Sequence, residues 1–133
     1  MAGLSHYLTE QALDCFFNAT APTPPTELWF ALYNTNPTAA NTGTEVSGGG
    51  YARVEITGMT AADIVSGKMT TSNSAAVQMA AASSSWTTAN FWALLDAETS
   101  GNLLVFGALL APANVTIGQQ PQFAIGDLKI IME

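Results

Sequence analysis

The chain has 133 residues, of which 48% are hydrophobic and 10% are charged; three cations face ten carboxylates, which gives a net charge of −7. Three cations cannot neutralise the several phosphates that a nucleic acid presents, and an acidic surface is repelled by DNA and by anionic lipid. We therefore expect neither a nucleic-acid partner nor a membrane partner.

The first predicted element is an amphipathic helix over residues 5–17, because apolar side chains recur there with the helical period. Ser5 is the expected N-cap, and Asn18 together with the prolines at 22, 24 and 25 ends the pattern. A helix this short is marginal alone, so we expect its apolar stripe to pack against other residues. The stripe consists of Leu4, Tyr7, Leu8, Ala12, Cys15 and Phe16.

Cys15 is the single cysteine, so no disulfide forms within the chain and secretion into an oxidising compartment is not indicated. We expect its thiol to be a small core group. The segment from Met1 to His6 lacks the basic and apolar regions of a signal peptide, and no apolar run approaches the length of a membrane span. These features predict a soluble protein made in the cytoplasm.

From residue 28 the period changes to two, which is typical of strands. Residues 28–33 are apolar on both sides of the alternation, which predicts a strand buried on both faces. Further short strands are predicted at 51–56, 75–79, 91–96, 103–110, 114–117, 122–125 and 128–132. The pattern favours a mainly β fold, an antiparallel, jelly-roll-like β-sandwich preceded by one α-helix. We expect a single domain over 1–133, with a helical arm at 1–20 and the sandwich at 26–133.

Residues 34–50 are a predicted long loop that ends in Gly48, Gly49 and Gly50. Glycines allow positive φ and a close approach of the backbone, so the loop can turn sharply before Tyr51. Glu45 and Arg53 lie on either side of this turn and can form a bidentate ion pair that pins it, either within one chain or between subunits.

The residue types offer little for catalysis or metal binding. His6, the single histidine, lies nine residues from Cys15, about 13 Å along the predicted helix, which is too far for a direct pair. Asp96 and Glu98 could hold a hard cation with Asn102, but the closing of a hairpin turn explains this segment without a metal and is the favoured interpretation. The glycine triplet precedes Tyr51 rather than the Lys-Ser/Thr of a phosphate loop. We expect no enzyme, no cofactor and no metal.

Aromatic residues permit one further alternative, a carbohydrate-stacking platform. Trp86 lies in a small, polar segment at 80–89 and is expected either to anchor a loop or to be an exposed contact residue. The other candidates for such a platform are Trp29, Tyr33, Tyr51 and Trp92, most of which fall inside predicted strands.

Two segments carry a specific resemblance. Residues 45–53 read Glu-Val-Ser-Gly-Gly-Gly-Tyr-Ala-Arg, and residues 96–104 read Asp-Ala-Glu-Thr-Ser-Gly-Asn-Leu-Leu. Together with the helix, the proline run and residues 27–33, they resemble the small virion proteins of tailed bacteriophages that are labelled tail-fibre-like or head decoration proteins. The resemblance covers nearly the whole chain and implies a structural, oligomeric β-sandwich protein without catalytic residues.

We accordingly expect a virion protein that forms a homo-oligomer, for example a trimer. Its expected role is capsid decoration or cement, in which each copy bridges subunits of the major capsid protein or another virion protein. The alternatives are a tail-fibre or baseplate component and a module that binds host glycans. The candidate interface or loop-pinning residues are Leu4, Tyr7, Leu8, Glu45, Gly48, Gly49, Gly50, Tyr51, Arg53 and Trp86.

Overall fold

The structure, a computed structural model, describes residues 3–132 and is mainly β, with antiparallel pairing between its strands and an N-terminal helix. This confirms the predicted class, while the jelly-roll connection stays a prediction. Residues 1, 2 and 133 of the expected domain lie outside the described range. The elements are β1 (Gly3–Leu4), α1 (His6–Phe17), β2 (Trp29–Tyr33), β3 (Val54–Glu55), β4 (Asp63–Val65), β5 (Lys68–Ser72), β6 (Val77–Gln78), β7 (Ala89–Leu95), β8 (Leu103–Ala113), β9 (Gln122–Phe123) and β10 (Lys129–Met132).

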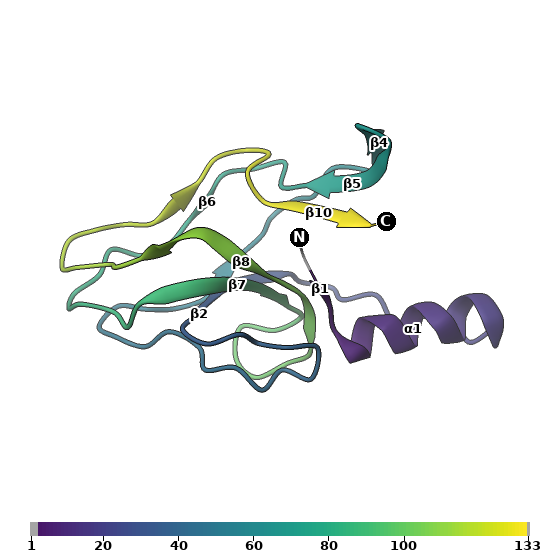
Figure 1. Cartoon of the computed structure of the whole chain (residues 1–133), viewed down its shortest axis with the longest axis horizontal. Helices are drawn as coiled ribbons and strands as arrows, with labels where there is room; N and C mark the ends of the chain where they lie inside the picture. The colour runs from purple at the N-terminus through teal and green to yellow at the C-terminus, as the bar shows by residue number, and fades with distance from the viewer. Residues whose placement is uncertain (1–2, 133) are drawn as a thin grey trace.

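The strands form one large sheet and two small ones. The large sheet has five strands in the order β1-β8-β7-β2-β3, and the small sheets are β10-β5-β4 and β6-β9. In Figure 1 the small sheets lie above the large one as a second layer, and a core that includes Phe30, Leu32 and Met79 fills the space between. A second cluster, which includes Tyr33 and Leu95, covers the opposite face of the large sheet. The strand β2 is therefore buried on both faces, as its apolar alternation predicts.

Two strand predictions need correction. Residues 114–117 form no strand. Val115 is buried, but it lies in an irregular segment, and its carbonyl accepts the backbone N–H of Trp86 at 2.9 Å. The hairpin β4–β5 is absent from the prediction, although its turn has a recognisable sequence. Ser66 and Gly67 both have positive φ, 52° and 79°, as a two-residue hairpin loop requires.

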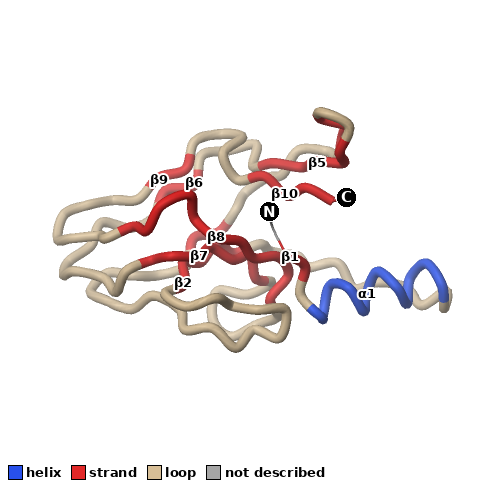
Figure 2. The backbone as a smooth tube through the Cα atoms, viewed as in Figure 1, coloured by secondary structure: helices blue, strands red, loops and turns tan. Residues whose placement is uncertain are grey.

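The helix begins close to where it is predicted and forms an arm whose residues are not buried in their own chain. Ser5 is the N-cap, and its Oγ accepts the Leu8 N–H at 3.0 Å. Leu4 belongs to β1, where it pairs with Val105 of β8, and not to the helical stripe. The helix then extends away from the sheets (Figure 2), and none of its residues is buried. The stripe therefore does not bury its residues in its own chain, and its docking on another surface stays a prediction. The expected core position of Cys15 is wrong, since Cys15 is only half-buried on this arm.

Within the described residues, no helix has both the length and the apolar character that crossing a membrane requires.

Candidate functional site

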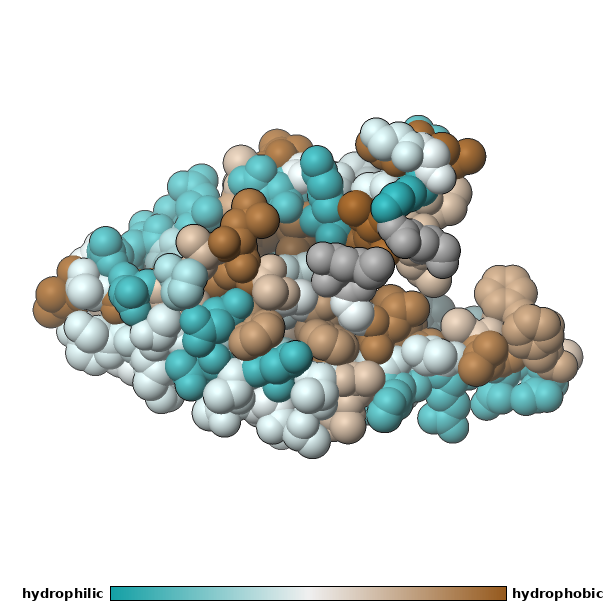
Figure 3. Space-filling view, in the orientation of Figure 1, coloured by the Kyte–Doolittle hydropathy of each residue, from teal (hydrophilic) through white to brown (hydrophobic). Residues whose placement is uncertain are grey.

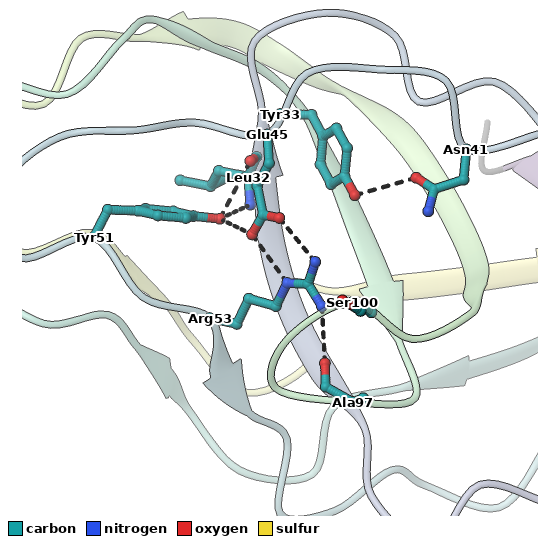
Figure 4. Close-up of polar contacts among 8 residues, drawn as sticks. All are labelled: Leu32, Tyr33, Asn41, Glu45, Tyr51, Arg53, Ala97 and Ser100. Atoms are coloured by element: carbon teal, nitrogen blue, oxygen red, sulfur yellow. Dashed lines mark hydrogen bonds and ion pairs between the residues drawn. The ribbon is translucent and has the colours of Figure 1, made fainter.

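Arg53 is the centre of a polar cluster that closes the 34–50 loop (Figure 4). Its Nε donates to Glu45 Oε1 at 3.0 Å and its Nη2 to Glu45 Oε2 at 2.8 Å, so the expected bidentate pair forms within the chain. Its Nη1 donates to the carbonyls of Ala97 at 2.9 Å and Ser100 at 2.7 Å. We call these four residues and Tyr51 the Arg53 cluster.

Tyr51 connects the Arg53 cluster to the central strand. Its hydroxyl donates to Glu45 Oε1 at 2.8 Å and accepts the Leu32 N–H at 3.1 Å. Burial, and then the nearby Glu45 carboxylate, raise the pKa of Tyr51, so the hydroxyl stays protonated. Burial alone would lower the pKa of Arg53, but its hydrogen bonds and charge interaction with Glu45 outweigh this and raise it.

Hydrogen bonds hold the 34–50 loop, which the Arg53 cluster closes, alongside β2. The Val46 N–H donates to the Leu32 carbonyl at 2.9 Å, and the Asn34 N–H to the Thr44 carbonyl at 2.8 Å. The Tyr33 hydroxyl donates to Asn41 Oδ1 at 3.2 Å (Figure 4). Because the Arg53 side chain is only 9% exposed and bonds to its own chain, the Arg53 cluster is a structural clamp that joins β2, the long loop and the β7–β8 turn.

The glycine triplet makes the close backbone approach that its sequence predicts. Gly48 has a φ of +154°, and a Cβ there would lie 2.5 Å from Cδ1 of Trp86. A Cβ on Gly49 would lie 2.5 Å from the hydroxyls of Ser83 and Ser84. The Gly49 carbonyl accepts the Trp86 Nε1–H at 2.9 Å. The triplet therefore docks directly on the 80–89 segment.

Trp86 is the anchor of that docking and not an exposed contact residue. It is 6% exposed, and its ring packs edge-on against Tyr51 with the ring centroids 5.2 Å apart. Tyr33 is buried as well, so neither Trp86 nor Tyr33 can contribute an exposed ring to a carbohydrate platform.

The turn at Asp96 is closed by its own side chains. Asp96 Oδ1 accepts the Asn102 N–H at 2.6 Å, and Oδ2 accepts the Asn102 side-chain amide at 2.8 Å. These bonds fit the hairpin interpretation of the segment. Over residues 3–132 the structure groups no three His, Cys, Asp or Glu side chains in a way that suits a metal ion.

The helix α1 has the apolar side that its amphipathic pattern predicts, but the C-terminal part of that side lies in water. Its polar side carries two hydrogen bonds: Gln11 Oε1 accepts the Thr23 N–H of the returning chain at 3.2 Å, and Asp14 Oδ1 accepts the side-chain amide of Asn18, the C-cap of the same helix, at 2.7 Å. Phe16 and Phe17 are 82% and 80% exposed. Figure 3 shows the result, with teal side chains along one side of the helix and brown and tan side chains along the other. Of the predicted interface candidates, Tyr7 and Leu8 lie half-buried in its first turn.

An open apolar groove of about 620 Å³ lies between β8 and the C-terminal segment. Its apolar walls include Trp92, Leu109, Leu110, Phe123, Leu128 and Ile131. In the sheet, β1 pairs only with Val105 and Phe106, so among the described strands residues 107–113 of β8 have a neighbour on one side only. Sequence reasoning identified this strand but not its open apolar surface. The run Leu109-Leu110-Ala111, with no polar residue for a solvated side, is the signal that marks it.

Comparison with known proteins yields one family. Residues 3–131 match the family described as Podophage GP4 fiber I protein gp80. A comparison with curated proteins finds no match. The match extends over nearly all of the chain and agrees with the resemblance carried by residues 45–53 and 96–104. The chain therefore belongs to the podophage fibre I protein family, and so to the structural proteins of the phage virion.

Proposed function

We propose that this chain is a non-catalytic structural subunit of a phage tail fibre, and that it acts by packing against neighbouring virion subunits, including copies of itself. The observation that carries the proposal is the match to the fibre family over residues 3–131. The family favours the tail-fibre role over the capsid-decoration role that the composition and the resemblance first indicate.

The use of the polar residues supports a non-catalytic role. The Arg53 cluster joins the charged or polar side chains of Arg53, Glu45 and Tyr51 to the carbonyls of two loop residues, and its hydrogen bonds stabilise a loop. A catalytic group needs access to a substrate, which the 9% exposure of the Arg53 side chain does not provide.

The exposed apolar residues support assembly. The structure leaves Phe16, Phe17, Ile64 and Leu110 more than half exposed, although the chain carries few charges that would keep it soluble. Large exposed apolar patches on a soluble protein mark surfaces that bind other proteins. Burying them in a fibre removes this surface from water and stabilises the assembly by mass action.

The test is the location of the protein on the particle. An epitope inserted at Gly118, where the surroundings are open, leaves the core and the apolar surfaces intact. We expect gold-labelled antibody on the tails of purified phage and a copy number far below that of the major capsid protein, measured by quantitative mass spectrometry. Phage that carries the untagged protein is the control. Labelling spread over the head, with a copy number near that of the capsid protein, would contradict the fibre role and support decoration.

A further inference from the structure

The helix α1 has an apolar surface that lacks a partner within the described chain. The returning chain contacts its polar side at Gln11, whose Oε1 accepts the Thr23 N–H, while Phe16 and Phe17 on its apolar side are 82% and 80% exposed. An amphipathic helix is ordinarily held the other way round, with its apolar side against the protein. A short arm that presents two phenylalanines to water is expected to be stable only when a further surface covers them.

The groove beside β8 has the chemistry of such a surface. It is open, and its lining includes residues 107–111 and 113 of β8 together with Ile131 of the C-terminal segment. Its volume of about 620 Å³ is in the range in which proteins bury sizeable apolar groups. Docking of an amphipathic helix into an apolar groove is a common mode of recognition, and neighbouring aromatic side chains on the helix are typical anchors.

The charged residues of α1 and of the groove also favour docking of the helix there. The helix α1 carries the carboxylates of Glu10 and Asp14 and no Lys or Arg, whereas Lys129 lies at the groove. Asp127 also lines the groove, but its Oδ2 accepts the Ala124 N–H at 3.0 Å and is fixed in that turn. A long lysine side chain at the rim can reach the acidic side of a docked helix while its methylene groups cover apolar surface.

The area is appropriate for contact between copies. A phenylalanine buries roughly 150–250 Å², so Phe16 and Phe17, at 82% and 80% exposure, supply about 250–400 Å² together. A stable interface needs about 800 Å² from each partner. One helix in one groove supplies part of this, and two such contacts in a reciprocal pair, or a ring in which each copy uses both surfaces, supply the rest.

We propose that α1 of one copy docks its apolar side into the β8 groove of a second copy of this chain, with Phe16 and Phe17 as the anchors. The inference deepens the proposed fibre role, because it names the surfaces through which copies of the subunit join. Since the helix and the groove are different surfaces of the same chain, every copy has both halves of the contact.

The experiment measures the mass of the full-length protein in solution by sedimentation velocity over a concentration series. We expect the wild-type protein to associate. The double variant Phe16→Glu/Phe17→Glu removes the helix half of the contact, and Leu110→Glu removes the groove half. All three side chains are more than half exposed, so both variants should keep the fold. Circular dichroism checks this. We expect each variant alone to dissociate, with the dissociation constant raised by about 30-fold or more. Ile117→Glu, at an exposed site outside both surfaces, is the control and should associate as the wild type does.

Mixing the two variants provides the decisive measurement. The helix variant keeps an intact groove and the groove variant keeps an intact helix, so an equimolar mixture restores one helix-in-groove contact. It should form a two-copy species that neither variant forms alone, and this species should be weaker than the wild-type assembly because one contact buries only part of the area. If the mixture behaves as two monomers at every concentration up to its solubility limit while the wild type associates, the helix pairs with another surface and the proposal is overturned. A wild-type protein that stays monomeric up to its solubility limit, or association lost equally in Ile117→Glu, also overturns it. Neither result changes the expected labelling of phage tails, so failure of the docking and failure of the fibre role remain distinguishable.

Discussion

Replacing Arg53 with alanine is expected to destabilise the fold and to loosen the 34–50 loop. The change removes the four hydrogen bonds of Arg53 and leaves the Glu45 carboxylate and the carbonyls of Ala97 and Ser100 without these donors. Removal of one partner of a buried ion pair costs about 3–5 kcal/mol. Because the Glu45 side chain is 27% exposed and keeps its bond from Tyr51, we expect the lower end, about 3 kcal/mol. For a chain of this length that corresponds to a fall in Tm of about 10 °C.

The assay combines urea unfolding with hydrogen exchange. We expect faster exchange of the amides that the loop directs at β2, such as Val46, with little change in the small sheets. Arg53→Lys is the matched control: it keeps the charge but cannot span both carboxylate oxygens and two carbonyls, so its loss should be intermediate. In a double-mutant cycle, Glu45→Ala should cost less once Arg53 is alanine. A destabilisation of Arg53→Ala below about 0.5 kcal/mol, the range of ordinary surface changes, together with unchanged exchange of the loop, would refute the clamp.

Three further predictions concern the parts of the fold that position the loop and the small sheets. Burial, and then Glu45, raise the pKa of Tyr51, so the folded protein keeps the hydroxyl proton at pH values above 10.0, where the unfolded chain loses it. The contribution of Tyr51 to the free energy of unfolding is therefore fully present below pH 10.0 and falls as the pH rises further. The urea midpoint should decline less with rising pH in Tyr51→Phe than in the wild type. An equal alkaline decline in both proteins would contradict this. Asn73 is fully buried and bonds to the backbone of Ala75, Ala124 and Leu128, so Asn73→Ala should cost about 3 kcal/mol in urea unfolding; a loss under a third of that would show that water replaces those bonds. Gly49→Ala should cost about 1–3 kcal/mol by forcing the loop away from Ser83 and Ser84, and a wild-type thermal midpoint would show that the approach is loose.

Local patterns predicted much of the fold because they report short-range physics. The alternation in residues 28–33 identified a strand buried on both faces, and Ser5 identified the start of the helix. The hairpin β4–β5 was not predicted because Asp63–Val65 are all exposed and show no clear alternation of apolar and polar side chains. Ser66 and Gly67, which form its turn, were the local signal that could have identified it. The buried Val115 produced the opposite error, since a single core contact from an irregular segment resembles a short strand.

The candidate site could likewise be predicted only where its residues lie close together in the sequence. The pair of Glu45 and Arg53 could be predicted because the chain holds only three cations and a glycine turn brings the two residues together. The two carbonyls that complete the clamp come from the β7–β8 turn, more than forty residues away in the chain, and no local pattern links them to Arg53.

The sequence by itself determined where the helix and most of the strands of the large sheet form, which residues are apolar, and that charge is too scarce for a nucleic-acid surface, because propensity, period and charge act over a few residues. Only the tertiary structure decided which apolar residues are covered. The path of the chain after α1 brings Thr23 to Gln11 on the polar side of the helix and leaves Phe16 and Phe17 in water, and the end of β1 leaves one edge of β8 open. Hydrophobic periodicity shows that a side chain favours burial, but where the chain runs decides whether the chain itself or another molecule buries it.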